Sequence, residues 1–237
     1  MATSTIDHVR ARRTTVALKI AMAVTGTIFV LFLLVHMYGN LKMFGGPDAY
    51  NGYADWMRDF GYPLIPHEGL LWILRVTLAV SIVVHVSAAI TLWRRAGTAR
   101  GRAYKVNTGK KITTARKYTA SMMRWGGLGL VLFIVFHLLH FTTLTIEVGD
   151  QFREISPYER MVQSFSPEHW YIYVIYFVSL AIILYHVHHG AWSAFATMGL
   201  SRTKRERTYK TIADVIALAL FVGFMVPPTA ILVGIIS

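Results

Sequence analysis

The sequence predicts an all-α integral membrane protein with five transmembrane helices, and three observations lead to this fold class. The 237 residues are 54% hydrophobic and 13% aromatic, with a mean hydropathy of +0.46, which is too apolar for a soluble domain of this length. Five segments are apolar over about the 20 residues that a helix needs to cross a bilayer. The basic residues behind the net charge of +12 lie between those segments, which indicates membrane topology and excludes a nucleic-acid-binding face.

The five predicted spans belong to one membrane domain, residues 1–237, and cover about 18–38, 69–93, 125–146, 171–197 and 211–236. A helix satisfies its own backbone hydrogen bonds, as the bilayer requires. The first span follows a basic segment, as a signal peptide would. It has no cleavage site of small residues and continues past Val35, which favours a retained helix. Aromatic residues that prefer the membrane interface stand at span ends: Trp72, Trp93, Trp125, Trp170 and Tyr171.

The lysine and arginine residues predict how the spans are oriented. Most lie before span one, between spans two and three, or between spans four and five. These are Arg10, Arg12, Arg13, Lys19, Arg94, Arg95, Arg100, Arg102, Lys105, Lys110, Lys111, Arg116, Lys117, Arg124, Arg202, Lys204, Arg205, Arg207 and Lys210. The opposite side carries only Lys42, Arg58, Arg153 and Arg160. The positive-inside rule therefore places the N-terminus in the cytoplasm and the C-terminus outside.

Histidine is concentrated in the first four spans. Polar side chains inside the hydrocarbon are costly and usually mark a site. The chain has no cysteine, so any iron must be held by histidine. The histidines of the spans are His36 in span one, His85 in span two, His137 and His140 in span three, and His186, His188 and His189 in span four.

The depth of these histidines predicts two pairs. Odd spans run outward, even spans run inward, and a helix rises about 1.5 Å per residue. His36 lies near the outer end of span one, and His137 lies about 18 Å from the inner interface, in the outer half. His85 and His186 both lie roughly 22 to 24 Å from the outer interface. We therefore expect an outer pair from spans one and three and an inner pair from spans two and four.

Two imidazoles from opposite helices can hold a heme iron from both faces, which favours electron transfer over oxygen chemistry. The pairs thus predict two b-type hemes, an outer one on His36 and His137 and an inner one on His85 and His186. His140 is the reserve ligand on span three. We interpret His188 and His189 as hydrogen-bonding residues beside the ligands. The histidine-free fifth helix is expected to be peripheral to this four-helix heme-binding bundle.

A polar cluster is predicted at the outer mouth of spans one and two. Quinone reduction takes up two protons, so a quinone pocket needs titratable or hydrogen-bonding groups near an interface. The candidates are Tyr38, Asp55, Asp59, His67 and Glu68. Arg75, the basic residue within span two, is a candidate partner for a heme propionate. No catalytic residue is expected in this chain.

Four stretches of the sequence carry a resemblance to a known family. They are LVHMYGNLKMFGGPDAYNGYA in and after span one, VVHVSAAI in span two, RWGGLGLVLFIVFHLLHF in span three and YHVHHGAWSAFATMGL in span four. Together they resemble the single-chain, five-helix, diheme cytochrome b anchor of succinate dehydrogenases and fumarate reductases. The resemblance covers about residues 19–200 and is most specific in span four, where His186 is followed by Gly190, Trp192, Ser193 and Gly199.

The resemblance implies a respiratory complex II of the tricarboxylic acid cycle in a bacterial cytoplasmic membrane. In that complex a flavoprotein oxidises succinate, and an iron–sulfur subunit passes the electrons on at the cytoplasmic side. The membrane anchor is the quinone-reactive subunit, and by itself it does not act on succinate. In the family, helices one and three carry the distal heme and helices two and four the proximal one. Menaquinone is the usual substrate of diheme members.

Two alternatives remain for the histidines. The first is a heme-poor anchor of the same complex, whose histidines serve quinone or complete an iron–sulfur cluster with a partner's cysteines. The second is a proton or metal transporter, in which intramembrane histidines relay protons or bind ions. Carboxylates lie only at the ends of spans one to four, which disfavours the transporter.

Overall fold

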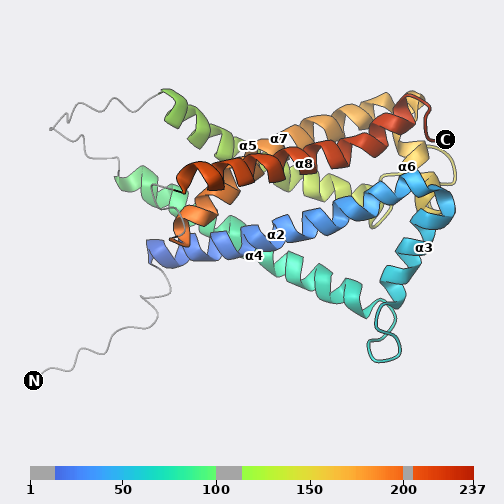
Figure 1. Cartoon of the computed structure of the whole chain (residues 1–237), viewed down its shortest axis with the longest axis horizontal. Coiled ribbons are helices and arrows are strands. Elements are labelled where there is room, and N and C mark those ends of the chain that lie inside the picture. Colours follow the sequence, from blue (N-terminus) through green and yellow to red (C-terminus); the bar gives the residue numbers. More distant parts are fainter. Residues whose placement is uncertain (1–13, 100–113, 200–204) are drawn as a thin grey trace, which may run out of the picture.

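The computed structural model describes residues 14–99, 114–199 and 205–237, which form helices and their connections (Figure 1). The long helices are α2 (Thr15–Leu41), α4 (Gly69–Ala99), α5 (Thr114–Phe141), α7 (Trp170–Thr197) and α8 (Glu206–Leu232). Each of these five is long and apolar enough to cross a membrane. The predicted five-helix fold class is therefore confirmed, and the chain is a multi-pass membrane protein.

Four short helices gather at one end of the bundle: η1 (Lys42–Gly45), α3 (Gly46–Asp59), α6 (Pro157–Phe165) and η2 (Pro167–His169). Figure 1 shows α3 and α6 side by side at this end. The chain turns from η1 into α3 at Gly46, whose φ of 82° favours glycine. Following the predicted orientation, we name this the outer end and the opposite one the inner end.

The orientation itself stays a prediction. Of the basic residues on which it rests, Arg10, Arg12, Arg13, Arg100, Arg102, Lys105, Lys110, Lys111, Arg202 and Lys204 lie outside the described residues. Two contacts do bring inner helix ends together. Arg95 of α4 donates to the Thr15 hydroxyl of α2 over 3.4 Å, and the Arg124 guanidinium of α5 lies 5.5 Å from the centre of the Trp93 ring of α4.

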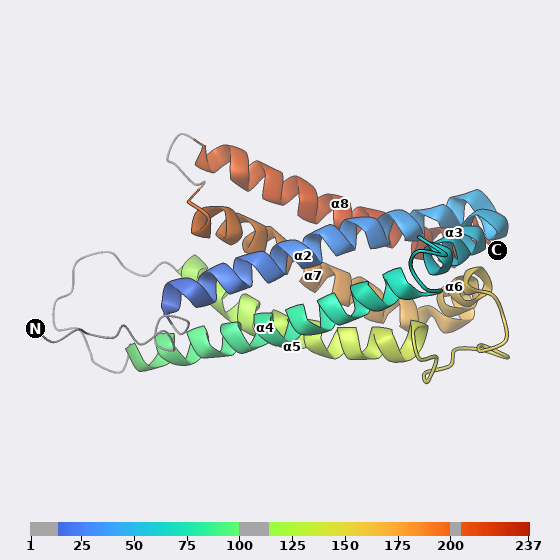
Figure 2. The same ribbon diagram turned by 90° about the horizontal axis from the view of Figure 1, so that it is seen from below.

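Contacts connect the long helices in the order α4, α2, α7, α5, and Figure 2 shows these helices running lengthwise along the bundle. Helix α2 packs against α4 and α7, and α5 packs against α7, so α4 and α5 form the two flanks. Their midsections expose apolar side chains, including Val80 on α4 and Leu132 on α5. Such surfaces are stable in lipid, because hydrocarbon does not penalise apolar exposure.

Helix α8 is more closely integrated than its predicted peripheral position implies. It lies beside the four-helix arrangement, against α7 and α2, and has the largest buried share of the five spans. Small residues allow this packing, because Ala213 and Ala217 are buried next to the fully buried Leu220. The physical reason is that the surface of α8 fits closely against its neighbours. The absence of histidine from span five, on which the predicted peripheral position rested, gives no information about this fit.

Two helices end earlier than the sequence predicts. Helix α5 ends at Phe141, not near residue 146, because the amides of Thr143 and Thr145 turn back to the carbonyls of Leu138 and Leu139. Helix α8 ends at Leu232, not near residue 236, and Gly234 follows with a φ of 75°. Both ends close with hydrogen bonds that satisfy otherwise free carbonyls.

The larger of two buried apolar clusters lies at the outer end, where α6 and the loop before it cover the bundle. Helix α6 starts with a capping box, in which Ser156 and Glu159 exchange hydrogen bonds between backbone and side chain. The core of the cluster consists of Met43, Val148, Phe152, Tyr158, Met161, Phe165, Ile172, Tyr176, Ala230, Ile231 and Ile236. This cover fixes the outer ends of α5 and α7 in place.

Candidate functional site

The structure brings His85 of α4 and His186 of α7 together between the helices. Their ring centroids are 6.3 Å apart and their planes are inclined by 52°. Glycines of the other two helices stand beside them. A Cβ on Gly26 of α2 would lie 3.7 Å from Cε1 of His85, and a Cβ on Gly127 of α5 would lie 3.9 Å from Cε1 of His186. We name His85 and His186 the inner pair.

Thr25 determines which nitrogen of His85 carries its proton. The Thr25 hydroxyl lies 2.7 Å from the Ala21 carbonyl and 2.9 Å from Nδ1 of His85. Its single hydrogen is donated to the carbonyl, so its oxygen accepts from Nδ1–H of His85. The neutral ring then has a free lone pair on Nε2, which is the form that binds a metal ion.

His186 has a buried nitrogen without a partner. Its Nδ1 makes no hydrogen bond to the described part of the chain. Buried polar side-chain atoms are nearly always paired in native proteins, so an orphan requires a specific explanation. A site for another molecule at this edge of the imidazole provides one.

His36 of α2 and His137 of α5 form the outer pair. Their ring centroids are 5.9 Å apart, with planes inclined by 80°. Aromatic rings surround them: Phe32 stacks on His36 at 5.3 Å, Phe224 of α8 lies 5.6 Å from His36, and Phe133 lies 5.8 Å from His137. This shell is apolar, and apolar surroundings strengthen electrostatic interactions between the imidazoles and any bound cofactor.

The two pairs occupy different levels of the bundle. On α2, Gly26 stands at the inner pair and His36 belongs to the outer pair, which separates the levels by about 15 Å along the helix. On α5, Gly127 and His137 give the same separation of about 15 Å. The spacing between the two levels is therefore the same on both helices. The rings that we expected to be neighbours from their depth in the membrane do lie together.

Both pairs fit a metal ion held from two sides. Metal–imidazole bonds are about 2 Å long, so two rings that share one ion have centroids roughly 6 Å apart, close to the observed 6.3 and 5.9 Å. Within the described ranges, His, Asp and Glu side chains do not gather in threes or more that could hold an ion. Paired imidazoles suit a cofactor that supplies its remaining ligands itself, as a porphyrin does.

The reserve residue His140 has no free nitrogen. It is 0% exposed, and its Nδ1 lies 3.1 Å from the Tyr176 hydroxyl while its Nε2 lies 3.1 Å from the Ser164 hydroxyl. The ring also stacks on Phe152 at 5.5 Å. On α5 it is His137, not His140, that faces His36.

Two further histidines lie away from both pairs. His189 contacts the Trp192 ring at 6.4 Å, and His188 pairs with the carboxylate of Asp214 on α8 over 2.5 Å. Both partners of this ion pair are about half-exposed. Asp214 was missed by the sequence analysis, although a carboxylate within an apolar span is itself a signal of a polar partner.

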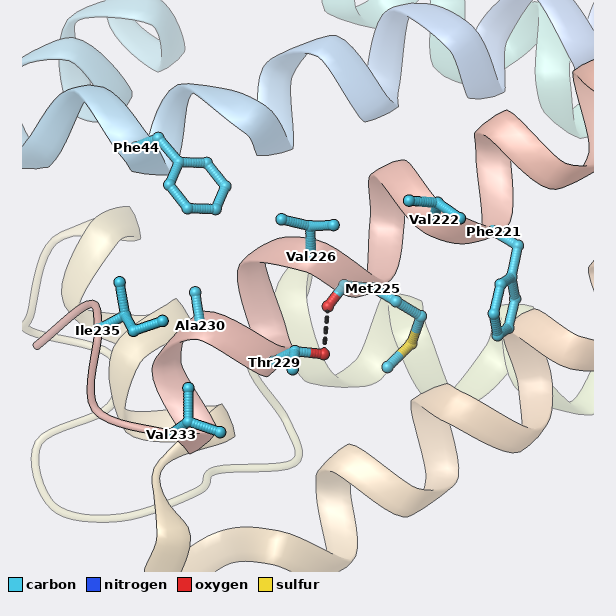
Figure 3. A pocket seen from close by; sticks show the side chains of 9 residues that line it. All are labelled: Phe44, Phe221, Val222, Met225, Val226, Thr229, Ala230, Val233 and Ile235. Atoms are coloured by element: carbon cyan, nitrogen blue, oxygen red, sulfur yellow. Dashed lines mark hydrogen bonds between the residues drawn. The ribbon is translucent and has the colours of Figure 1, made fainter.

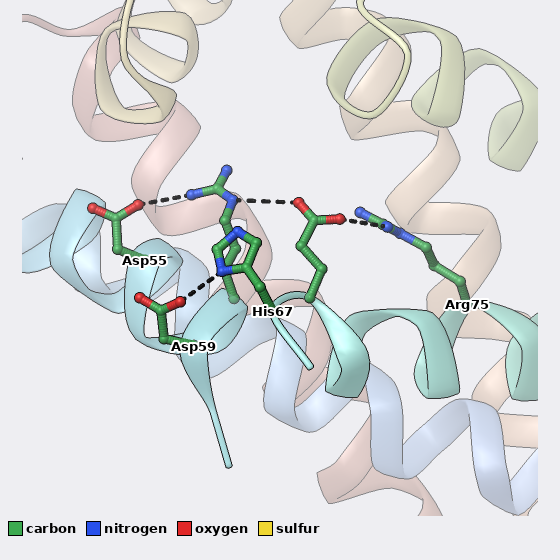
Figure 4. A network of polar contacts seen from close by, with 6 residues as sticks. Asp55, Asp59, His67 and Arg75 are labelled. Atoms are coloured by element: carbon green, nitrogen blue, oxygen red, sulfur yellow. Dashed lines mark hydrogen bonds and ion pairs between the residues drawn. The ribbon is translucent and has the colours of Figure 1, made fainter. Parts of the chain in front are cut away.

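The outer polar candidates form a network around two arginines (Figure 4). Arg58 lies 2.8 Å from Asp55 and 3.9 Å from Glu68, and Arg75 lies 3.2 Å from Glu68. Close by, Nδ1 of His67 lies 2.7 Å from the Asp59 carboxylate. These side chains are all substantially exposed, so the network lines an open rim.

Tyr38 does not join this network. Its ring lies 5.9 Å from that of Tyr53, and the Lys42 ammonium lies 4.8 Å from its centre. Arg58 therefore links the candidates Asp55 and Glu68, Asp59 and His67 form a separate pair close by, and Tyr38 lies apart.

An apolar groove of about 350 Å³ lies between α8 and Phe44 (Figure 3). Its lining residues are Phe44, Phe221, Val222, Met225, Val226, Thr229, Ala230, Val233 and Ile235. The one hydroxyl is that of Thr229, which donates to the Met225 carbonyl over 2.7 Å. The groove suits a hydrocarbon chain better than a polar headgroup.

No family model, curated protein or solved structure matches the chain. The functional proposal is therefore carried by the chain's own residues and their arrangement.

Proposed function

We propose that the chain is the cytochrome b membrane-anchor subunit of a succinate:quinone oxidoreductase. His85 and His186 hold an inner b-type heme, and His36 and His137 hold an outer one. The observation that carries this proposal is the arrangement of four imidazoles, from four helices, in two facing pairs at two levels. The two hemes would supply one-electron redox centres that link an iron–sulfur subunit to quinone.

The chain's residues perform three tasks in this proposal. Thr25 keeps Nε2 of His85 free of its proton. Gly26 and Gly127 leave room beside the inner pair. The aromatic rings around the outer pair make its surroundings apolar. With two imidazoles on each iron, no coordination position would stay open, which would favour electron transfer.

The inner end suits the soluble partners. Basic side chains gather there, including Arg95, Arg124 and Lys210, and a positive rim orients an acidic partner by electrostatic steering. We place the flavoprotein and iron–sulfur subunits on this side, at the cytoplasmic face of a bacterial membrane. The chain itself does not act on succinate.

Quinone, most simply menaquinone, reacts at the outer end in this proposal. The Asp59–His67 pair and the partly exposed Glu68 could exchange protons with water, as the reduction requires. Asp55 offers a further hydrogen-bond acceptor in this network, and Tyr38 offers a hydroxyl apart from it. Arg75, on the outer part of α4, is the candidate partner for a heme propionate. The propionate would replace some of the contact that Arg75 makes with Glu68.

The first prediction tests the pairing of the ligands. His85→Ala and His186→Ala should each remove the same b-type spectral component from the purified complex, because both rings hold one iron. The outer component should persist in both variants. The measurement is the heme content per chain together with the reduced-minus-oxidised spectrum.

His169→Gln is the control for this experiment, because His169 lies in η2 and bonds only to Ser166 and the Gln163 carbonyl. It should retain both components. Loss of different components in the two alanine variants would contradict the pairing. A wild-type complex without b-type bands would overturn the proposed function.

One observation favours a second candidate, a proton transporter. The contact of His188 with the Asp214 carboxylate gives an intramembrane histidine the acidic partner that proton relays use. Reconstituted chain that lacks heme bands yet dissipates a proton gradient, and loses this activity in Asp214→Asn, would support the transporter against the cytochrome.

A further inference from the structure

A continuous line of hydrogen bonds leads away from His137 at the outer end of the bundle. The Tyr176 hydroxyl of α7 lies 3.1 Å from Nδ1 of His137 and 3.1 Å from Nδ1 of His140. Nε2 of His140 lies 3.1 Å from the Ser164 hydroxyl, which donates to the Arg160 carbonyl over 2.6 Å. His140 and Ser164 are both 0% exposed and Tyr176 is 7% exposed, so water does not compete for these bonds.

The donor and the acceptor of each hydrogen bond can be assigned by starting at the Arg160 carbonyl and working back toward His137. The single hydrogen of Ser164 goes to the Arg160 carbonyl, so its oxygen accepts from Nε2–H of His140. Neutral His140 therefore has a lone pair on Nδ1, which accepts the hydrogen of the Tyr176 hydroxyl. The Tyr176 oxygen is then left as an acceptor for His137.

The consequence is a fixed tautomer for His137. Because the Tyr176 oxygen can only accept, His137 carries its proton on Nδ1 and presents a bare Nε2 lone pair. Thr25 achieves the same for His85 in a single step. We infer that Tyr176, His140 and Ser164 are positioning residues that set the tautomer and orientation of the outer ligand, an inference that rests on the proposed role of His137.

The line orients His137 and does not conduct protons. It ends on a backbone carbonyl, which has no proton to supply. Its anchor is rigid, since α6 carries the capping box at Ser156 and the Arg160 guanidinium donates to the carbonyls of Phe152 and Arg153 over 2.8 and 3.0 Å.

This arrangement also explains why span three carries two histidines on one face. Residues three apart on a helix are neighbours, and a single hydroxyl can meet Nδ1 of both His137 and His140. One imidazole faces His36 and the other completes the line to Ser164. His140 thus acts through His137 and not as an alternative ligand.

The test is the reduction potential of the outer heme in the purified complex. A histidine that donates Nδ1–H to an acceptor is a more basic metal ligand, which favours the oxidised iron. Tyr176→Phe removes the acceptor and keeps the ring. It should shift the outer potential upward, leave the inner potential unchanged, and weaken outer heme affinity about tenfold.

Two further variants make the test specific. Tyr173→Phe is the matched control, because Tyr173 is also on α7 but its hydroxyl bonds to Thr229 and to neither histidine; it should leave both potentials unchanged. Ser164→Ala removes the far acceptor without touching His137. It should shift the outer potential in the same direction as Tyr176→Phe, by a smaller amount.

The outcomes separate this inference from the proposed function. An upward shift of the outer potential in Tyr176→Phe and Ser164→Ala, absent from Tyr173→Phe, supports it. If Tyr176→Phe does not assemble, Ser164→Ala decides alone. An unchanged outer potential in a heme-loaded variant, or an equal shift in Tyr173→Phe, overturns this inference only. A wild-type complex without heme overturns the proposed function, and this inference with it.

Discussion

At the scale of single residues, hydroxyl groups determine what the intramembrane imidazoles can do. Thr25 is 7% exposed and has only one hydrogen to give. Because the Ala21 carbonyl takes it, Thr25 acts as an acceptor toward His85. A threonine hydroxyl that bonds to the carbonyl four residues before it usually does no more than bend the helix slightly. Here the same hydrogen bond leaves His85 in the tautomer that can bind a metal ion.

Thr25→Val is the residue-scale prediction. Valine keeps the shape and removes the acceptor, so Nδ1–H of His85 loses its partner. We expect about tenfold weaker binding of the inner heme, with the outer heme unaffected, measured as heme retained per chain on titration with a heme-binding competitor.

Thr27→Val is its matched control. Thr27 lies on the same helix and its hydroxyl donates only to the Ala23 carbonyl, over 2.9 Å. It should keep the wild-type inner heme. An equal loss of inner heme in Thr25→Val and Thr27→Val would show that the threonines act on the structure of α2 and not through the hydrogen bond to His85.

At the scale of the element, α6 joins the outer loop to the bundle. The short helix is amphipathic and buries Tyr158, Met161 and Phe165 in the outer cluster. Its start depends on the capping box, in which the Ser156 amide donates to Glu159 over 2.8 Å. These hydrogen bonds from Ser156 lower the pKa of the Glu159 carboxyl below its ordinary 4.5.

The element-scale prediction concerns pH. A carboxyl whose pKa is lowered by folding stabilises the folded state above its ordinary pKa of 4.5, and this contribution is lost as the pH falls through the lower folded value. Glu159→Gln retains a capping acceptor but has no charge. Wild type should unfold at a higher temperature than the variant at neutral pH, and the difference should vanish in acid.

Thermal unfolding of the full chain in detergent, from neutral pH to below 4.5, measures this dependence. A difference between wild type and Glu159→Gln that stays constant over that range would assign the effect to shape and not to the charge of the carboxylate.

At the scale of the whole molecule, the fifth helix completes the bundle. Helix α8 packs along α7 and α2, and its Phe224 ring reaches His36. Gly223 makes this approach possible, because a Cβ there would overlap the Met37 side chain of α2. The helix without histidine therefore still forms one wall of the outer pair.

Gly223→Ala is the prediction for the molecule. The added methyl group forces Met37 or α8 to move, and overpacking of this kind costs about 1–3 kcal/mol. Thermal unfolding of the full chain should show the loss, and the outer heme should be bound less tightly than the inner one.

Gly97→Ala serves as the comparison. It lies within α4 with open space around it, so the substitution should be neutral or stabilise the helix by up to about 1 kcal/mol. Equal stability of Gly223→Ala and Gly97→Ala would mean that α8 does not depend on close contact with α2.

The amino-acid sequence by itself determined the five helices and the height of each histidine along them. This follows because lipid supplies no hydrogen bonds, so every apolar run of sufficient length must be helical, and the rise per residue then converts position into depth. That spans one and three would share an outer pair, and that His85 and His186 would meet at one height, was predictable from depth; what the pairs bind remains a prediction.

Only the tertiary structure decided which ring on α5 faces α2, what orients each imidazole, and where α8 belongs. His137 and His140 lie a single turn apart, so depth could not separate them, whereas the rotation of α5 about its axis does. The partners Thr25 and Tyr176 are distant in sequence from the histidines they hold. Such choices depend on side-chain packing between helices, which has no local pattern from which it could be predicted.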